Sequence, residues 1–215
     1  MKTFALIVRR GDHTRDAFRA HYEEQHAPLA VETVMEGTAR YVRHHIRDEV
    51  FGAPEFDVAT AFWYRELAAA QALVERVAGP AGERIRQDEE SFMDRPRNTF
   101  FPVTEHPVFG KEDRDAGLLA LALVRAPVGD DRDAFLSDYE SRWVPGLLEA
   151  AREPAWCLQN RTLAFGPEPP AYDCVTQLHA AGDSGLRAWA AELAEGGASV
   201  CLVAVSEHET VTPWG

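Results

Sequence analysis

The sequence has few cysteines, and its basic residues are too few to balance its acidic ones. The three cysteines, Cys157, Cys174 and Cys201, are odd in number and lack CxxC spacing, which disfavours a disulfide framework and a zinc site. The formal net charge is −13, with 22 Lys and Arg against 35 Asp and Glu. Nucleic acids and anionic membranes require clustered cations, so neither partner is expected. We expect a cytoplasmic protein whose cysteines act as small apolar residues.

Several motifs of catalysis and binding are also missing. No HExxH or HxH pair offers metal ligands, and neither GxGxxG nor GxxxxGK[ST] is present to hold a nucleotide. A nucleophile elbow is absent as well. The opening residues MKTFALIVRRGD are predicted to form a strand, since their apolar run is too short for a signal peptide or a membrane span. No metal ion or cofactor is therefore expected.

An internal repeat is the strongest signal in the chain. FRAHYEEQHAPL at residues 18–29 returns as FLSDYESRWVPGL at residues 135–147, and a shift of 117 aligns seven identities within fifteen positions. Towards the end of each half the shift falls to 102, where VTEH meets VSEH. The first half therefore holds about 14 additional residues, which we place in ERIRQDEESFMDRPR, residues 83–97.

Each half is predicted to have the element order βαββαβ, typical of a ferredoxin-like unit. Thr14 is the expected N-cap of the first helix. The strands and helices are expected at 4–9, 14–29, 39–46, 56–64, 67–78 and 99–105, and again at 118–124, 133–151, 156–163, 172–178, 185–193 and 200–205.

The predicted fold class is α+β, with two tandem ferredoxin-like βαββαβ halves that form a pseudo-dimeric α+β barrel. The halves are expected at residues 1–109 and 116–215, joined by the charged, turn-rich segment EHPVFGKEDRDAG. The strands are apolar on both faces, so the face of each sheet that the helices leave bare must also be covered. Two sheets in one chain can cover each other.

These segments resemble the EthD-like family of dimeric α+β-barrel proteins. The resemblance rests on FRAHYEEQHAPL, on ARYVRHHI as the next strand, on FDVATAFW and YDCVTQL as third strands, and on SFMDRPR before VTEH. It covers both halves as a tandem duplication. The second half departs from the pattern, because Trp143 replaces His26 and the stretch around Asp94 has no counterpart. Related barrels include cofactor-free monooxygenases, polyketide cyclases, dehydratases, lactone isomerases and haem enzymes, so the resemblance implies a small-molecule cavity.

His26, Tyr22 and His44 are the candidate catalytic residues. His26 lies one turn beyond Tyr22, and Pro28 cannot donate to the carbonyl of residue 24, so the helix is expected to kink or end beside His26. An imidazole transfers protons near pH 7, and a neighbouring phenol can orient it or bind an oxyanion. Without a functional role, His26 would bond a freed carbonyl or lie at a solvated helix edge. Trp143 is expected to fill and close the equivalent position of the second half.

Residues on the predicted inner strands are candidates for substrate binding. Only one of the neighbouring residues His44 and His45 can face a cavity, and we favour His44 because it alternates with Val42. The pair Glu105 and His106 in the first half returns as Glu207 and His208 in the second, which favours a structural role for both pairs at a strand end. The candidate binding residues are Arg40, Tyr41, Asp57, Thr60 and Trp63.

The resulting hypothesis is a small-molecule enzyme that acts on an aromatic or polyketide-like, enolisable substrate by His-mediated proton transfer. Cyclisation, dehydration, isomerisation and decarboxylation all fit this chemistry. One alternative is a cofactor-free or haem-dependent monooxygenase on the same fold. Another is a non-catalytic module that binds such a metabolite. A homodimer is compatible with the sequence, which does not identify the substrate.

Overall fold

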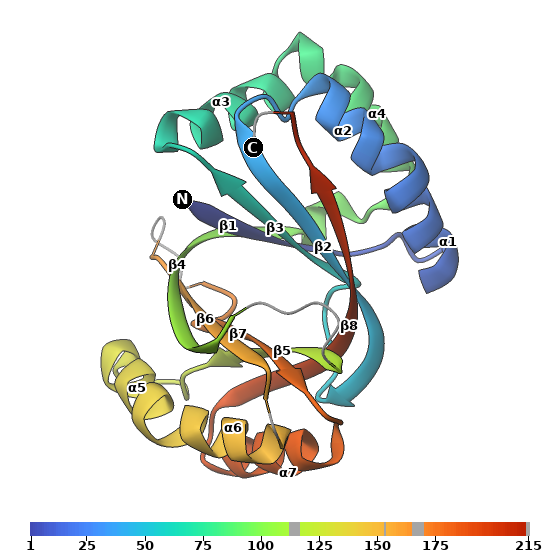
Figure 1. Ribbon diagram of the computed structural model, residues 1–215. Coiled ribbons are helices and arrows are strands. Elements are labelled where there is room, and N and C mark those ends of the chain that lie inside the picture. Colours follow the sequence, from blue (N-terminus) through green and yellow to red (C-terminus); the bar gives the residue numbers. More distant parts are fainter. Residues whose placement is uncertain (112–116, 153, 165–169, 214–215) are drawn as a thin grey trace. The chain divides into compact units, whose positions relative to one another are not determined.

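The first half of the chain forms four strands and a layer of helices in the computed structural model, which describes residues 1–111, 117–152, 154–164 and 170–213 (Figure 1). The strands are β1 (Lys2–Ile7), β2 (Thr38–Phe51), β3 (Val58–Tyr64) and β4 (Thr99–Gly110). The helical segments are α1 (Arg15–His21), η1 (Tyr22–His26), α2 (Ala27–Thr33), α3 (Leu67–Ala78), η2 (Pro80–Gly82), α4 (Glu83–Phe92) and η3 (Arg95–Arg97).

The second half repeats this order over its described residues, apart from α4 and the short 3₁₀ turns beside it. Its strands are β5 (Leu118–Arg125), β6 (Trp156–Thr162), β7 (Cys174–Ala180) and β8 (Ser199–Val211). Its helices are α5 (Arg132–Asp138), η4 (Tyr139–Trp143), α6 (Val144–Ala151) and α7 (Ser184–Glu195). Helix α4 occupies the segment that the repeat comparison identified as additional, residues 83–97.

The strands are hydrogen-bonded in the closed order β1-β3-β2-β8-β5-β7-β6-β4, so the predicted α+β barrel class is confirmed. The chain forms two compact units. Unit 1 holds Met1–His45, Glu55–Pro102 and Glu207–Gly215, and unit 2 holds Ile46–Pro54 and Val103–Ser206. Each unit therefore takes segments from both halves of the sequence.

The predicted linker is partly wrong. Residues 105–110 belong to β4, which pairs with β6 as far as Gly110 opposite Trp156. The apolar residues Val108 and Phe109 within EHPVFGKEDRDAG suit a strand better than a loop. Residues 112–116 of that segment lie outside the described residues.

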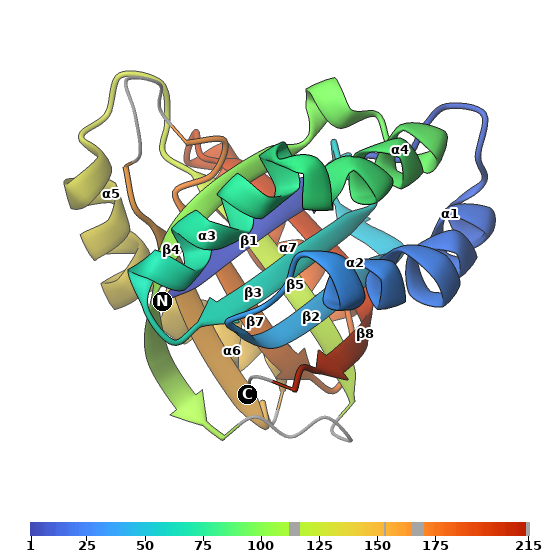
Figure 2. The same cartoon turned by 90° about the horizontal axis from the view of Figure 1, so that it is seen from above.

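In unit 1, helices cover one face of the β1-β3-β2 sheet (Figure 2). Side chains alternate along each strand, so Ala5 and Ile7 face the helices while Phe4 points to the other face. The buried cluster between helices and sheet contains Phe18, Tyr22, Tyr41, Val58 and Phe92 among others. This apolar layer fixes the helix that carries the candidate catalytic residues.

In unit 2, α6 and α7 pack together over β5 and β7, and the buried cluster includes Tyr139, Leu147, Leu186 and Trp189. Both repeats start their first helix in the same way. Thr14 Oγ1 accepts from the Ala17 amide, which confirms the predicted N-cap, and Asp131 accepts from the Ala134 amide. The repeated sequence thus specifies the same local structure in each half.

The helix that carries His26 does not end at Pro28. Instead, the segment from Tyr22 to His26 widens into a π-helical turn, in which the Ala27 amide donates to the Tyr22 carbonyl. Tyr139 to Trp143 does the same before Pro145. Proline cannot donate to the carbonyl four residues earlier, so the shift in hydrogen-bond register lets the chain pass it without a break. The expected kink or end is therefore a π-turn.

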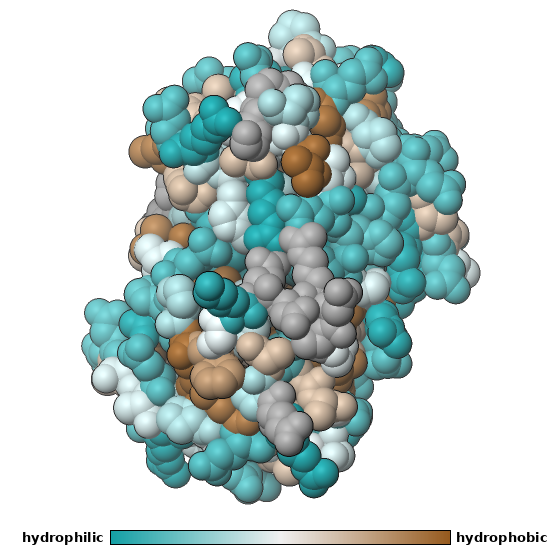
Figure 3. All heavy atoms as spheres, in the orientation of Figure 1, coloured by the Kyte–Doolittle hydropathy of each residue, from teal (hydrophilic) through white to brown (hydrophobic). Residues whose placement is uncertain are grey.

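Hydrophilic residues dominate the molecular face drawn in Figure 3. Within the described residues, no helix is both long enough and apolar enough to cross a membrane.

Candidate active site

His26 is buried and bonded to a carboxylate that comes from α4. Its Nδ1 lies 2.7 Å from Oδ2 of Asp88, and the other oxygen of Asp88 lies 2.8 Å from Nε2 of His21. A carboxylate only accepts hydrogen bonds, so both of these imidazole nitrogens carry the proton. We call His26, Asp88 and His21 the Asp88 triad. Its geometry leaves Nε2 of His26 as the nitrogen able to accept a proton.

Aromatic rings surround the imidazole of His26. The ring of Tyr22 lies 4.9 Å from it in an edge-on arrangement, and the ring of Phe92 lies 5.3 Å away. Burial acts to raise the pKa of Asp88, yet the hydrogen bonds from His26 and His21 outweigh it and lower that pKa. Asp88 is therefore ionised at neutral pH and able to orient both imidazoles.

A second histidine and carboxylate lie on the other side of Tyr22. The ring of His45 is 5.5 Å from that of Tyr22, and its Nε2 lies 2.6 Å from Oε1 of Glu23. The other oxygen of Glu23 lies 3.8 Å from Nδ1 of His208. We call His45, Glu23 and His208 the Glu23 triad. The guanidinium of Arg43 also bonds both oxygens of Glu23.

Tyr22 connects the helix to the sheet through its hydroxyl. It lies 3.1 Å from the hydroxyl of Thr60 and accepts from that of Tyr41 at 3.4 Å. Burial raises the pKa of Tyr22 and raises that of Tyr41 well above its usual value. Both phenols therefore stay neutral at physiological pH and remain hydrogen-bond donors.

The second half repeats the Tyr–Thr contact without the charged groups. Tyr139 lies 2.9 Å from Thr176, as Tyr22 does from Thr60. At the position of His26 stands Trp143, and the second half has no segment that matches α4 among its described residues. The Tyr–Thr bond is thus part of the repeated scaffold, whereas the His–carboxylate pairs are specific to the first half.

Asp57 has a repeated contact of the same kind. It lies 3.1 Å from Nε of Arg9 and 3.2 Å from Nε of Arg15. Its counterpart Asp173 lies 2.6 Å from Nε of Arg132. Both halves thus use this carboxylate to hold the start of the first helix, so the contacts of Asp57 belong to the repeated scaffold.

The remaining predicted residues lie on the sheet face that points away from the helices. His44 contacts the ring of Phe4, and its Nε2 lies 3.2 Å from Glu207. Arg40 and Lys2 both stack on Trp63, with Arg40 Cζ 4.5 Å and Lys2 Nζ 4.2 Å from the ring. The structure thus brings together Tyr22, His26, Tyr41 and Thr60, and separates them from His44, Arg40 and Trp63.

Sequence reasoning missed Asp88, Glu23, His45 and His21. Asp88 could have been found from the additional segment at residues 83–97, since an insertion in the half that keeps His26 is a signal for a site. The repeat comparison drew attention to Asp94 in that segment, and its carboxylate lies 4.0 Å from the guanidinium of Arg97. His45 was ranked below His44 because apolar residues on both strand faces conceal which face meets the helices.

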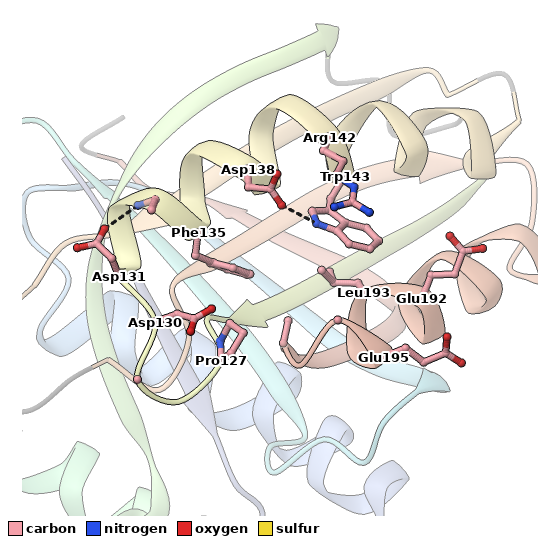
Figure 4. Close-up of a pocket in the computed structure, with 14 residues that line it drawn as sticks. Pro127, Asp130, Asp131, Phe135, Asp138, Arg142, Trp143, Glu192, Leu193 and Glu195 are labelled. Atoms are coloured by element: carbon pink, nitrogen blue, oxygen red, sulfur yellow. Dashed lines mark hydrogen bonds between the residues drawn. The ribbon is translucent and has the colours of Figure 1, made fainter.

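Trp143 lines a hollow of about 810 Å³ in unit 2 instead of closing its position (Figure 4). The indole nitrogen donates to Asp138 at 3.1 Å, and the guanidinium of Arg142 lies over the ring at 4.8 Å. The expectation that Trp143 closes this position is therefore wrong. The lining residues are Pro127, Gly129, Asp130, Asp131, Ala134, Phe135, Asp138, Arg142, Trp143, Glu192, Leu193, Glu195, Gly196 and Ala198.

No group of three or more His, Cys, Asp or Glu side chains within the described ranges is arranged to hold a metal ion. The fold and the site together define an α+β-barrel protein with histidine–carboxylate pairs under one helix layer. Residues 10–96 match the family model of the EthD domain, so this segment is similar to the EthD family. No curated protein sequence matches the chain.

Solved structures with the same fold cover nearly the whole chain. An anthrone oxidase-like protein is similar with a TM-score of 0.61 at 14% identity, over 99% of this chain and 93% of that one. A mutant chlorite dismutase from Candidatus Nitrospira defluvii has a TM-score of 0.53 at 10% identity, over 95% and 90%. A protein described as a monooxygenase from Lactobacillus acidophilus NCFM has a TM-score of 0.52 at 10% identity, over 98% and 95%. At these identities the similarity establishes the fold alone.

Proposed function

We propose that the first half is a small-molecule enzyme in which His26 transfers a proton to or from an enolisable aromatic or polyketide-like substrate. The bond between His26 and the buried end of Asp88, at 2.7 Å, carries this proposal. A histidine that only satisfied a helix carbonyl would need no carboxylate. The pair also depends on α4, which has no counterpart in the part of the second half that the structure describes.

Asp88 determines which nitrogen of His26 acts. Since Nδ1 donates to Asp88, Nε2 holds the lone pair that accepts a proton from an acidic C–H. The carboxylate also stabilises the imidazolium that forms. Tyr22 remains a neutral phenol beside the ring and can donate to an enolate oxygen. These roles fit cyclase, dehydratase, isomerase or decarboxylase chemistry of the lyase or isomerase type.

The test measures enolisation directly, without knowledge of the natural substrate. Anthrone and 2,4,6-trihydroxyacetophenone serve as probes in D₂O under argon, and ¹H NMR follows the loss of the acidic C–H signal. His26→Ala is expected to lower the protein-dependent exchange by roughly 10²- to 10⁴-fold. His106→Ala, within β4 in the other unit, is the matched control and keeps the rate. Exchange that ignores His26, or its absence with both probes, would refute the proposal.

A cofactor-free monooxygenase is the second candidate, favoured by the fold shared with the anthrone oxidase-like protein. The same base would form the anthrone carbanion, and O₂ would then convert anthrone into anthraquinone and water. An oxygen electrode run beside the exchange assay separates the two candidates. Uptake of one O₂ per anthrone consumed supports the oxygenase, whereas exchange without uptake supports proton transfer alone.

A haem-dependent version requires space for a porphyrin beside a ligating imidazole. Tyr22 and Phe92 pack against His26, so a porphyrin at this nitrogen would have to displace those rings. We therefore place the cofactor-free version first. A Soret band in the absorbance spectrum of the purified protein would reverse that order.

A non-catalytic metabolite-binding module remains the third candidate, and it predicts probe binding without exchange. The small-molecule substrate, a homodimer and a cytoplasmic location belong to this proposal as well. Light scattering on the purified protein reports the oligomeric state, and cell fractionation reports the location.

A further inference from the structure

Two chains of imidazole, carboxylate and imidazole flank the same tyrosine. In the Asp88 triad, the side-chain exposure rises from 7% at His26 through 14% at Asp88 to 20% at His21. In the Glu23 triad it rises from 2% at His45 through 16% at Glu23 to 40% at His208. Each triad thus runs from a buried ring beside Tyr22 towards solvent.

The charges of the Glu23 triad suit a proton route. Burial acts to raise the pKa of Glu23, but hydrogen bonds from His45 and Arg43 outweigh it and hold that pKa at about 2. Burial lowers the pKa of His45, against the opposing effect of Glu23, and the charges of His208 and Arg19 lower it further. At rest, His45 is therefore neutral at physiological pH beside an ionised carboxylate.

Proton movement along this triad needs one small side-chain shift. Nε2 of His45 donates to Glu23 at 2.6 Å, which is a strong hydrogen bond. The 3.8 Å between Glu23 and His208 is an ion-pair distance, and a shift of about 1 Å in either side chain brings the two groups within hydrogen-bond reach. The rings of His45 and His208 are perpendicular at 5.4 Å. The exposed ring can exchange its proton with buffer.

We infer that His45, Glu23 and His208 form a second proton route between the site around Tyr22 and solvent. The inference rests on the proposed function and deepens it. When His45 Nδ1 takes a proton from a substrate C–H, the proton on Nε2 passes to Glu23 and on to His208, which releases one to solvent, and the reverse sequence delivers a proton. One C–H bond breaks, N–H and O–H bonds form and break along the route, and the substrate keeps the electron pair as its enolate.

Two routes define a narrower substrate class than one. One base is enough to form an enolate, but formation of the neutral enol also needs a group that protonates its oxygen. An isomerisation or dehydration removes a proton at one atom and delivers one at another, so it needs two groups. The substrate class is therefore an aromatic or polyketide-like carbonyl compound with one acidic C–H and a second position that must be protonated.

The first experiment tests the link and needs no substrate. The protein is labelled with ¹⁵N-histidine, and the imidazole shifts are titrated between pH 5 and 9 in wild type, Glu23→Gln and Glu24→Gln. Glu24 is the exposed neighbour on the same turn, so its variant removes the same charge without touching the triad. Glu23→Gln is expected to lower the pKa of His45 further, because the Glu23 carboxylate opposes the effect of burial, and Glu24→Gln is expected to lower it clearly less. Equal shifts in the two variants would overturn the link.

The second experiment tests proton flow with the anthrone exchange assay at 1 mM buffer. His208→Ala is expected to lower the exchange rate roughly tenfold, and 50 mM imidazole is expected to restore it, because a small buffer can replace an exposed ring. His106→Ala, the repeat counterpart of His208, should keep the full rate. A rate that is unchanged in His208→Ala, or lowered without rescue while the melting temperature is preserved, would overturn the inference. If only His26→Ala lowers the exchange rate, the proposed function stands and the proton route through the Glu23 triad is refuted. If wild type shows no exchange, the proposed function is refuted, while the titration still tests the contact between Glu23 and its histidine partner.

Discussion

His26 Nδ1 and Asp88 Oδ2 lie 2.7 Å apart although 62 residues separate them in the sequence. One partner belongs to a π-turn that both halves possess, and the other belongs to α4, for which the described residues of the second half show no counterpart. Both halves therefore share the scaffold of the site, and the contact with α4 distinguishes the first half.

Asp88→Asn should separate positioning from simple packing. Asparagine has nearly the same volume, but it is neutral and can no longer fix both imidazoles through two accepting oxygens. The anthrone exchange rate at saturation is expected to fall roughly 10- to 100-fold, with KM changed less than about twofold. Asp94→Asn is the control, since Asp94 contacts only the distant end of Arg97. A rise in KM at constant kcat would mean that Asp88 shapes binding and does not orient His26.

The repeat made the overall fold accessible from sequence. The first helix of each half has a capping residue, a tyrosine and a proline in the same order: Thr14, Tyr22 and Pro28, then Asp131, Tyr139 and Pro145. The same sequence pattern therefore predicted the same local structure in both halves. The comparison also located the additional segment that became α4. These features are local in the chain, and local hydrogen bonding and hydrophobic period determine them.

The contacts of the site were harder to predict from the sequence, because they depend on which face of a strand meets a helix. His44 and His45 are neighbours, and both strand faces are apolar, so period alone could not show that His45 lies beside Tyr22. The Asp88 contact depends on how α4 docks on the helix that carries His26. The π-turn also moved His26 from the margin of the buried face to a position in which it is buried.

Tyr22→Phe and Tyr139→Phe form a matched pair that separates scaffold from site. Their hydroxyls make similar bonds to Thr60 and Thr176, at 3.1 and 2.9 Å. Each variant should lower the free energy of unfolding by about 1 kcal/mol, because one buried hydrogen bond is lost. Only Tyr22→Phe should also lower the exchange rate, and by less than His26→Ala does. Urea denaturation and the exchange assay check this, and equal loss of exchange in both variants would contradict it.

The three cysteines should be unreactive in the folded protein. All three are buried, and burial raises the pKa of Cys157 and Cys174 to about 12. At pH 8 such a thiol is ionised in roughly one molecule in 10⁴, and the thiolate is the reactive form. Ellman's reagent should therefore label less than one thiol in the native protein within an hour and all three in 6 M guanidinium chloride. Rapid native labelling would show that unit 2 opens locally.

Glu23 should make stability depend on acid. Its folded-state pKa of about 2 lies below the ordinary 4.5, so the ionised carboxylate stabilises the fold fully above about pH 4.5, and this contribution is lost as the pH falls towards 2. Glu23→Gln should lower the free energy of unfolding at pH 7 by about 2 kcal/mol, once solvent screening of a partly exposed carboxylate is allowed for. It also leaves the buried guanidinium of Arg43 without its carboxylate partner.

Urea denaturation of wild type and Glu23→Gln from pH 7 to 3 checks this prediction. The difference in the free energy of unfolding between the two proteins should shrink below pH 4.5, because protonated Glu23 and glutamine are both neutral. Glu24→Gln, on the exposed side of the same turn, should stay within about 0.5 kcal/mol of wild type throughout. A gap that stays constant down to pH 3 would show that Glu23 acts through packing, and would remove the electrostatic basis of its contact with His45.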